Sequence, residues 1–253
     1  MTTVTALPLS ARSLCGEGVG GRGPGVACLA VRCGAELETM DLRPLLPLLG
    51  AEERARLEAM TTPQRRAEFA LARSLVRRVL GGVLGRPPPE LRIRVTSRGK
   101  PYLDPPAGER RVFFSLSHTD GWMLLAVSRH APVGADVERI AEYPARIARR
   151  FCHPDELAWL AALPDDAARA DGFYRLWTVK EACVKALGMG IAHPLRTVRV
   201  DDGPAGRSGG IRWWRLEGFD GAHAAVARLG PGGAPPPILR FVDADDLASF
   251  EWR

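Results

Sequence analysis

FYRLWTVKEACVKALGMG is the sequence of residues 173–190, and its apolar positions predict a long amphipathic helix. The apolar face of this helix consists of Phe173, Leu176, Trp177, Val184 and Leu187. Lys180 falls on the same face, where its ammonium group must pair with an acid, extend to water or bind an anion. The helix pattern alone does not choose among these three possibilities.

Two further charged residues of the helix, Glu181 and Lys185, are four positions apart. The simplest interpretation is a surface ion pair between them, worth roughly a few tenths of a kcal/mol. This pair does not explain Lys180. Gly188 and Gly190 are expected to end the helix, because glycine readily adopts the left-handed conformation of a helix C-terminal cap.

Lysine is rare in this chain. Of the 35 basic residues, 32 are arginine and three are lysine, namely Lys100, Lys180 and Lys185. Where the composition supplies arginine almost everywhere, a lysine suggests a need for a compact ammonium group. Two lysines on one helix could also be surface residues present by chance, so the count alone leaves both interpretations open.

The composition is that of a soluble globular protein. The chain has 253 residues, of which 46% are apolar and 25% charged, enough for one large domain or two domains with cores of their own. No window approaches the run of about 18 apolar residues that a membrane span needs, and the N-terminus lacks the basic-then-apolar order of a signal peptide. The five cysteines include no Cys-x-x-Cys pair, which favours a reduced, cytoplasmic protein without a zinc site or disulfides.

The formal net charge of +6 indicates an acidic partner. That partner could be nucleic acid, a phosphorylated small molecule or an acidic protein. Nucleic acid is disfavoured, because the chain has no basic run, no zinc-finger motif and no strands that carry rows of aromatic residues. Scattered arginines could still form a basic face in the folded protein, so this alternative stays open.

The sequence pattern predicts several strands and helices after a short lead-in. Residues 1–25 are rich in Gly, Ser, Thr and Arg and are expected to be a poorly ordered lead-in. Helices are predicted at 51–60 and 64–80, and strands at 26–33, 91–95, 112–116, 123–127 and 133–138. The tail adds strand-like segments at 197–200, 211–216, 224–229 and 238–242.

A weak internal repeat relates the two halves. At offsets of 103, 103, 103 and 104, four residues recur in order: Glu53 and Glu156, Leu57 and Leu160, Met60 and Leu163, Phe69 and Phe173. In each half they fall on a short helix, a break and a long helix that follow a strand. The repeat predicts two similar α+β halves, residues 26–130 and 131–253, with the functional site at their interface.

Asp136 and Glu138 are two positions apart on the predicted strand 133–138. They therefore project from one face, roughly 6 to 7 Å apart, while apolar residues cover the other face. Two carboxylates so placed repel each other unless a cation joins them, and their oxygens suit Mg²⁺ or Mn²⁺. The alternative is an exposed edge with two solvated acids.

Other polar residues lie at strand ends, in a turn and on a helix. Ser117 and His118 follow strand 112–116 in the predicted connection 117–121, and Lys100 lies in the turn before Pro101. A lone histidine is more often a structural hydrogen-bonding residue than a ligand, and a neighbouring Ser-His pair is no catalytic triad. Arg65 and Arg73 are eight positions apart on the helix 64–80, so they share a direction, although arginines on a helix are usually only solvated.

Taken together, the informative segments are Arg65 with Arg73, Gly99-Lys100-Pro101, Phe114-Ser115-Leu116-Ser117-His118, Gly134-Ala135-Asp136-Val137-Glu138 and Trp177-Thr178-Val179-Lys180-Glu181-Ala182-Cys183-Val184-Lys185. In order and spacing they resemble the 4'-phosphopantetheinyl transferases of the surfactin-synthetase-activating (Sfp-type) class. The signatures of that class are a Ser-His strand end, Gly-x-Asp-x-Glu and Trp-x-x-Lys-Glu-x-x-x-Lys. The resemblance covers about residues 45–200 and implies an α+β pseudo-dimer within one chain, and hence a monomer.

The resemblance implies transfer of the 4'-phosphopantetheine arm of coenzyme A to a serine of an acyl or peptidyl carrier protein, with release of adenosine 3',5'-bisphosphate. It implies that Asp136, Glu138 and Glu181 hold Mg²⁺ or Mn²⁺ against the pyrophosphate, which also makes Asp136 a coenzyme A-binding residue. Lys180 and Lys185 are expected to bind the pyrophosphate.

The resemblance also assigns residues to the nucleotide end of coenzyme A. The expected phosphate contacts are Arg65, Arg73, Lys100 and His118, and the residues that shape the pocket are Pro101 and Ser117. The serine nucleophile belongs to the carrier, so Glu181 is the expected base, directly or through a water, and Lys185 is expected to stabilise the leaving group. Ala135 departs from the usual Ile or Val of the motif, which removes no ligand.

Carrier proteins are typically acidic around their modified serine, which gives the charge of +6 a specific interpretation as docking and steering. The resemblance suggests residues 149–160 as the docking segment. Neither a membrane nor nucleic acid is an expected partner. The pathway, whether fatty-acid, polyketide or nonribosomal-peptide synthesis, stays open.

Two alternatives use the same residues. A metal-dependent nucleotide phosphohydrolase would employ these acids and lysines with water as the nucleophile. A carrier-binding module without activity would have lost part of the site, but every charged residue of the motifs is present.

Overall fold

The computed structural model describes residues 25–104, 111–189, 195–230 and 235–248. These residues form two compact units: one comprises residues 37–91 and 244–248, and the other contains the remaining described residues.

Two sequence-based expectations are not tested by this arrangement. Apart from Gly25, the expected lead-in lies outside the described residues. The division into halves at residue 130 stays a prediction.

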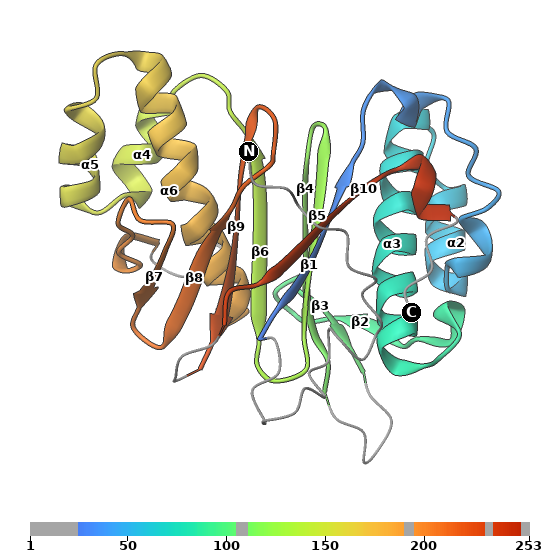
Figure 1. The fold of residues 1–253 in the computed structure, drawn as a ribbon. Coiled ribbons are helices and arrows are strands. Elements are labelled where there is room, and N and C mark those ends of the chain that lie inside the picture. Colours follow the sequence, from blue (N-terminus) through green and yellow to red (C-terminus); the bar gives the residue numbers. More distant parts are fainter. Residues whose placement is uncertain (1–24, 105–110, 190–194, 231–234, 249–253) are drawn as a thin grey trace. The chain divides into compact units, whose positions relative to one another are not determined.

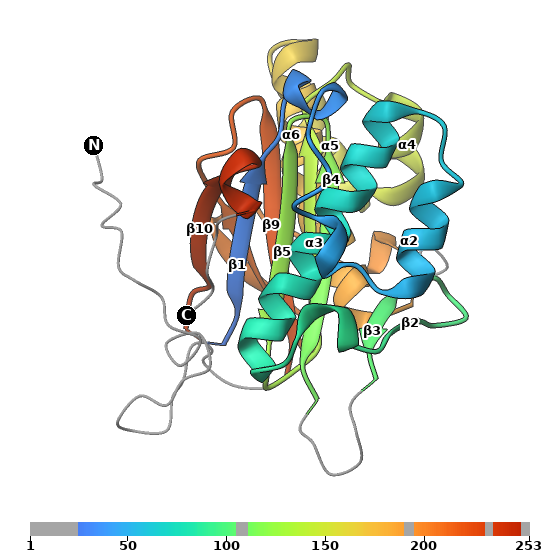
Figure 2. The same ribbon diagram turned by 90° about the vertical axis from the view of Figure 1, so that its right-hand side faces the viewer.

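The first unit is helical. Its elements are η2 (Leu46–Leu48), α2 (Ala51–Glu58), α3 (Pro63–Leu84), η3 (Pro88–Glu90) and η6 (Asp245–Ala248). The helices predicted at 51–60 and 64–80 are confirmed, and α2 packs beside α3 (Figure 2). Helix α3 begins with a proline, which needs no hydrogen-bond acceptor in the first turn, and ends at Gly85, whose φ of 65° is left-handed.

The first sheet of the second unit has the strand order β10-β1-β5-β4. Its strands are β1 (Ala27–Arg32), which the short η1 (Ala35–Glu38) follows, β4 (Phe113–Thr119), β5 (Trp122–Ser128) and β10 (Ile238–Asp243). β1 pairs antiparallel with β5 and parallel with β10, which comes from the far end of the chain. The predicted connection 117–121 is too long, because β4 continues to Thr119 and turns only at Gly121, with φ 87°.

The second sheet has the order β6-β9-β8-β7 and is antiparallel throughout (Figure 1). Its strands are β6 (Val133–Arg139), β7 (Ala205–Ser208), β8 (Ile211–Leu216) and β9 (Ala222–Leu229). A separate hairpin consists of β2 (Ile93–Val95) and β3 (Pro101–Leu103). The strand predicted at 197–200 is wrong, because a 3-10 helix, η5 (Leu195–Thr197), starts this segment and no strand follows before β7.

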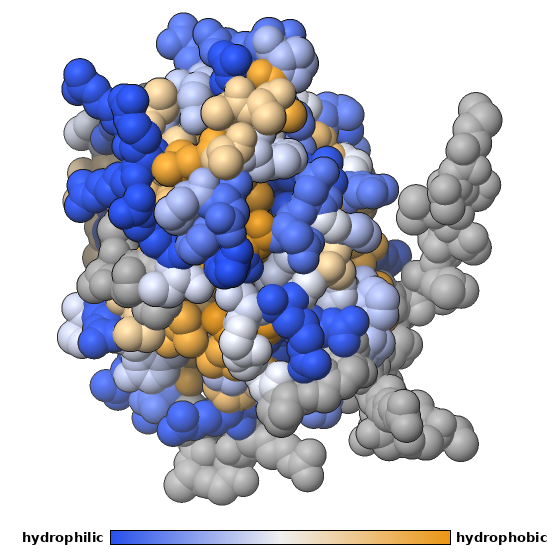
Figure 3. All heavy atoms as spheres, turned by 90° about the vertical axis from the view of Figure 1, so that its left-hand side faces the viewer, coloured by the Kyte–Doolittle hydropathy of each residue, from blue (hydrophilic) through white to orange (hydrophobic). Residues whose placement is uncertain are grey.

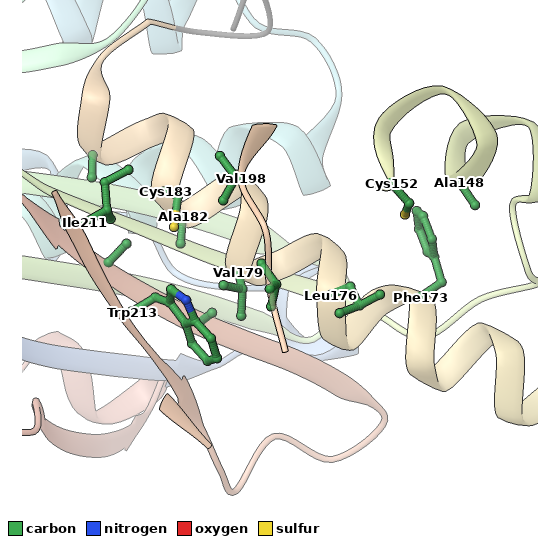
Figure 4. Close-up of a cluster of buried hydrophobic side chains, with 14 of the residues drawn as sticks. Ala148, Cys152, Phe173, Leu176, Val179, Ala182, Cys183, Val198, Ile211 and Trp213 are labelled. Carbon is green, nitrogen blue, oxygen red and sulfur yellow. The ribbon is translucent and has the colours of Figure 1, made fainter. Parts of the chain in front are cut away.

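Helix α6 covers one face of the second sheet. It is preceded by α4 (Ala145–Phe151) and α5 (Pro154–Ala161), and it runs over Asp166–Leu187. Phe173, Leu176 and Val179 of α6 belong to the same buried cluster as Trp213 of β8 (Figure 4). The helix ends at Gly188, with φ 69°, as predicted, whereas Gly190 lies outside the described residues.

The repeat extends to the ends of the helices. α2 and α5 are related by an offset of 103 residues at both ends, and so are α3 and α6 with their terminal glycines. Strands β1, β5 and β4 are neighbours in the same antiparallel order as β6, β9 and β8. The predicted match of Phe69 with Phe173 is one residue out of this register. The chain is thus an α+β protein with two sheets of similar construction, as predicted.

On the face that carries α4 and α5, hydrophilic residues surround smaller hydrophobic areas (Figure 3). None of the described helices has the length and apolar character needed to cross a membrane. Cys28, Cys33, Cys152 and Cys183 are buried and form no disulfide bond within the described residues, and Cys15 lies outside them.

Candidate active site

Gly134 lets β6 and α6 meet backbone to backbone. A Cβ atom added at this position would overlap the carbonyl oxygen of Ala182 and the backbone nitrogen of Ala186. Only glycine lacks this atom, so the first residue of the Gly-x-Asp-x-Glu motif sets the spacing of strand and helix. Asp136 and Glu138 follow at alternate positions, and both therefore project from the face of β6 that α6 covers.

Asp136 is buried at the centre of the site, with only 1% of its surface exposed. Its Oδ1 atom accepts hydrogen bonds from Lys185 Nζ at 2.6 Å and from Ser117 Oγ at 2.9 Å. Its Oδ2 atom is buried without a partner in the described part of the chain. Burial raises the pKa of Asp136, although Lys185 and Ser117 act in the opposite direction. A cation that reached Oδ2 would therefore stabilise the site.

The other two acids of the predicted metal site also have raised pKa values. Burial, followed by the charge of Asp136, raises the pKa of Glu138 to about 7, while Lys185 and a hydrogen bond from Trp177 partly oppose this. Burial and Asp136 likewise raise the pKa of Glu181. Three carboxylates whose charged forms are disfavoured, mainly by burial, are a donor set suited to a hard divalent cation. Within the described residues, however, no three potential ligand side chains already converge on one point.

Lys185 joins three elements. Its Nζ atom donates to Asp136 on β6 and, at 2.9 Å, to Ser117 Oγ on β4. The surface ion pair expected between Glu181 and Lys185 is therefore replaced by a partly buried pair between Lys185 and Asp136. The structure thus brings together Ser117, Asp136 and Lys185, three of the predicted site residues.

Hydroxyl groups link the first sheet to the second along β4. Ser115 Oγ accepts a hydrogen bond from the backbone nitrogen of Ala135 at 3.0 Å, and Thr119 Oγ1 accepts one from that of Arg139 at 3.1 Å. With Ser117, these residues form a row at alternate positions of β4. The sequence-based assignments gave no role to Ser115 or Thr119, although the alternation of hydroxyl residues from 115 to 119 was a visible signal.

Lys100 lies at the edge of a cavity of about 250 Å³, which is lined by Arg98, Gly99, Lys100, Pro101, Phe114, Ser115, Leu116, Lys185 and Gly188. Its Nζ atom donates to the carbonyl oxygens of Val133, at 3.2 Å, and of Lys185. Burial lowers the pKa of Lys100. The predicted residues Lys100 and Pro101 therefore share this cavity with Lys185, but the ammonium group of Lys100 is bonded to backbone carbonyls.

Lys180 lies elsewhere. Its side chain is fully buried, and its Nζ atom bonds to Glu156 Oε2 at 2.8 Å, to the carbonyl of Leu195 at 3.1 Å and to that of Val198. An ammonium group has three N–H donors, and all three have acceptors here. In this geometry Lys180 has no N–H group left to donate to a pyrophosphate. The buried ammonium group pairs with the carboxylate of Glu156 instead.

The remaining predicted residues are exposed or belong to the other unit. His118 is exposed near the end of β4. Arg65 is exposed on α3, and Arg73 lies half-buried on the same helix with its guanidinium 5.4 Å from the ring centre of Phe69. Their contacts with nucleotide phosphates stay predictions.

Comparison with known proteins shows which family has this combination of residues. Residues 132–226 match the model of the 4'-phosphopantetheinyl transferase superfamily. The chain is also 35% identical over 201 residues to the 4'-phosphopantetheinyl transferase HetI of Nostoc sp. strain PCC 7120, an alignment that covers 77% of this chain and 84% of that protein. The chain belongs to the 4'-phosphopantetheinyl transferase superfamily.

Further relatives of this phosphopantetheinyl transferase support the assignment. The 4'-phosphopantetheinyl transferase gsp of Aneurinibacillus migulanus is 36% identical over 131 residues, or 52% of each chain. The 4'-phosphopantetheinyl transferase Sfp of Bacillus subtilis strain 168 is 30% identical over 165 residues, which cover 60% of this chain and 71% of Sfp. The resemblance inferred from the motifs is therefore confirmed.

The matched region of the transferase contains β6 and α6, and so it includes all three acids and both lysines of the C-terminal motifs. The sequence identified Glu156 only as part of the repeat and not as the partner of Lys180. A signal was present, because the offset of 103 residues that relates Glu53 to Glu156 also relates Arg77 to Lys180.

Proposed function

We propose that the chain transfers the 4'-phosphopantetheine arm of coenzyme A to a serine of an acyl or peptidyl carrier protein and releases adenosine 3',5'-bisphosphate. The family membership supports the type of reaction. The observation that carries the proposal is the buried Asp136, which has one oxygen bound to Lys185 and Ser117 and the other without a partner in the described residues.

Asp136, Glu138 and Glu181 are the residues that would hold a divalent cation, Mg²⁺ or Mn²⁺. When bound, such an ion would neutralise the pyrophosphate oxygens of coenzyme A and orient them. The fit is one of donor chemistry: three acids with raised pKa values and one buried carboxylate oxygen without a partner in the described part of the chain.

In the proposed reaction, the serine Oγ of the carrier forms a bond to the phosphorus atom that bears the pantetheine arm. The bond from that phosphorus to the bridging oxygen breaks, and the adenosine bisphosphate leaves with the electron pair. Lys185 is partly exposed, so its ammonium group can stabilise the negative charge that develops on the leaving phosphate.

The cavity beside Lys100 would receive the nucleotide end of coenzyme A. Pro101 and Ser115 form part of its wall, and Lys100 could turn from backbone carbonyls to a phosphate of the ligand. Arg65, Arg73 and His118 are the further proposed phosphate contacts, and Ser117 supports the site through Asp136. We further propose that the enzyme acts as a cytoplasmic monomer.

Glu181 is the proposed base for the serine proton, directly or through a water. Its carboxylate belongs to α6 one turn before Lys185, and its raised pKa makes it a stronger base than an exposed glutamate. Glu181→Gln should therefore lower kcat sharply in a transfer assay. Full turnover by this variant, with unchanged affinity for the metal and coenzyme A, would eliminate the base role.

Intact-mass measurement of an apo-carrier tests the function. Incubation with the enzyme, coenzyme A and Mg²⁺ should increase the mass of the carrier by about 340 Da, the mass of the transferred group. A phosphohydrolase would cleave coenzyme A without this gain, and an inactive carrier-binding module would form a complex but leave both masses unchanged. A panel of fatty-acid, polyketide and nonribosomal-peptide carriers would identify the pathway.

A further inference from the structure

Two ion pairs, one partly and one fully buried, occupy matching positions in the repeat. Glu53 pairs with Arg77 in the first unit, and Glu156 pairs with Lys180 in the second. Each residue of the second pair follows its counterpart by 103 residues. Both cations are buried, with Arg77 5% exposed and Lys180 fully covered. Lys180, which belongs to the Trp-x-x-Lys-Glu-x-x-x-Lys motif, is therefore the counterpart of Arg77 on α3 in the repeat.

The two glutamates have the same role in their helices. Glu53 is the third residue of α2 and accepts a hydrogen bond from the backbone nitrogen of Gly50 at 3.1 Å. Glu156 is the third residue of α5 and accepts one from that of His153 at 2.7 Å. Each carboxylate thus caps a short helix and pairs with a cation of the following long helix.

The two cations also share their other partners. Arg77 donates to the carbonyls of Pro88, at 2.7 Å, and Leu91, at 3.1 Å, which follow α3. Lys180 donates to the carbonyls of Leu195 and Val198, which follow α6. Each cation therefore connects the short helix, the long helix and the segment after the long helix.

The second pair is fully satisfied on both sides. Glu156 Oε1 also accepts from the backbone nitrogen of Val200 at 3.0 Å, so both carboxylate oxygens have donors. A buried ion pair is tolerated only when its remaining donors and acceptors are bonded, and removal of one partner leaves an uncompensated buried charge. Lys180 thus has no donor to offer to a phosphate without breaking this arrangement.

We propose that Lys180 and Glu156 act as a positioning clamp for the catalytic residues of α6 and that Lys180 does not contact the pyrophosphate of coenzyme A. Glu181 is the next residue after the clamped lysine, and Lys185 lies on the following turns of the same helix. The clamp sets the rotation and height of α6 against α5 and residues 195–200, and thereby the direction of both side chains. This inference rests on the proposed function of Glu181 and Lys185.

Kinetics of Glu156→Gln and Lys180→Gln test the clamp. Both variants should lower kcat for carrier modification by about 10-fold to 100-fold, because small displacements of catalytic groups have effects of this size. The KM and the calorimetric Kd for coenzyme A should stay within about threefold of the wild-type values, a split that follows from lost positioning with intact binding. Lys180→Arg should recover much of the kcat, because an arginine occupies the matching position on α3.

Two results would overturn the clamp. A Lys180→Gln variant whose coenzyme A affinity falls tenfold or more, while Glu156→Gln binds normally, would identify Lys180 as a ligand. If Glu156→Gln and Lys180→Gln unfold at a lower temperature but turn over at the wild-type rate when folded, the pair stabilises the fold and does not position catalytic groups. If Lys180→Gln does not fold, Glu156→Gln and Lys180→Arg still separate these cases, since both keep a polar group in the buried site.

A matched control is Arg77→Gln, which breaks the corresponding pair in the other half of the repeat. It should lower the midpoint of thermal unfolding and leave kcat near the wild-type value. Wild-type enzyme must be assayed in parallel: if it adds no mass to any apo-carrier, the proposed function fails, whereas active wild type with unchanged kcat in both clamp variants refutes the clamp alone.

Discussion

The compact ammonium group of Lys185 binds the buried carboxylate of Asp136 in a geometry that a guanidinium group does not fit. Its ammonium nitrogen lies 2.6 Å from Asp136 Oδ1 and 2.9 Å from Ser117 Oγ, and these two oxygens are themselves hydrogen-bonded at 2.9 Å. The nitrogen and the two oxygens therefore form a compact triangle, with each atom within hydrogen-bond distance of the other two. A planar guanidinium spreads its donors over a wider fork and cannot occupy the same point.

Lys185→Arg should therefore impair transfer although it keeps the charge. We expect kcat to fall about tenfold or more in the intact-mass assay, because the leaving-group charge is no longer met at the same position. Lys185→Met is the companion variant and should lose more activity, since it also removes the charge. An arginine variant with wild-type kcat would show that charge alone suffices at this position.

Individual roles on α6 were only partly predictable from the sequence. Helical periodicity correctly indicated that Lys180 lies on the buried face of α6, and it left pairing with an acid as one of three possibilities. It could not identify that partner, because Glu156 comes from another helix and the two carbonyls come from the segment after α6. The motif likewise places Glu181 and Lys185 one turn apart, but the acid that pairs with Lys185 is on β6.

At the scale of elements, the contact between β6 and α6 depends on the absence of a Cβ atom at Gly134. Gly134→Ala would drive a Cβ atom into the backbone of Ala182 and Ala186, where no flexible side chain can move away. We expect a loss of about 1–3 kcal/mol or more in the free energy of unfolding, as for other overpacked sites. Because the strand must shift, Asp136 and Glu138 should also lose their place beside α6, so transfer should fall even in the folded fraction.

Gly210→Ala is the matched control for this prediction. A Cβ atom at Gly210 would meet no atom within 4 Å, and its backbone is not in the left-handed region. Chemical denaturation of both variants measures the difference, and activity per folded molecule measures the second effect. Equal stability of the two variants would contradict the close contact of β6 and α6.

Elements with a strong local signal were predicted well, and those set by distant contacts were not. The long helices have clear periods and glycine caps, and β4, β5, β6 and β8 are built on continuous or alternating apolar residues. β3 and β7 were missed because they are short, and β7 is formed largely by small and polar residues. Residues 197–200 resemble a strand in composition, but the carbonyls of Leu195 and Val198 turn toward Lys180.

At the scale of the whole molecule, the repeat predicted two similar α+β halves, and the structure has two sheets in which three strands follow the same order. The parallel pairing of β10 with β1 had no signal in the sequence, since the two strands are separated by almost the entire chain. The hydroxyl row of β4 is likewise a contact between sheets, which no local pattern specifies.

The charge of +6 gives the last prediction, which concerns carrier docking. Helix α4, which overlaps the proposed docking segment 149–160, exposes Arg146, Arg149 and Arg150. If these groups steer an acidic carrier, added salt should weaken the attraction, because the screening length falls from about 10 Å at 0.1 M to about 3 Å at 1 M. The KM for the carrier should therefore rise several-fold over this range, whereas kcat at saturating carrier should change little.

Site-directed variants separate steering by α4 from a general effect of salt. Arg149→Gln combined with Arg150→Gln should raise the carrier KM at low salt and flatten its dependence on salt. Arg92→Gln removes one exposed charge outside the proposed docking segment and should leave the slope nearly unchanged. If the carrier KM of the wild type is constant from low to high salt, steering by charge is refuted. Carrier recognition would then depend on apolar and shape contacts. Ile147 on α4, which is 43% exposed, is the first residue to replace in that case.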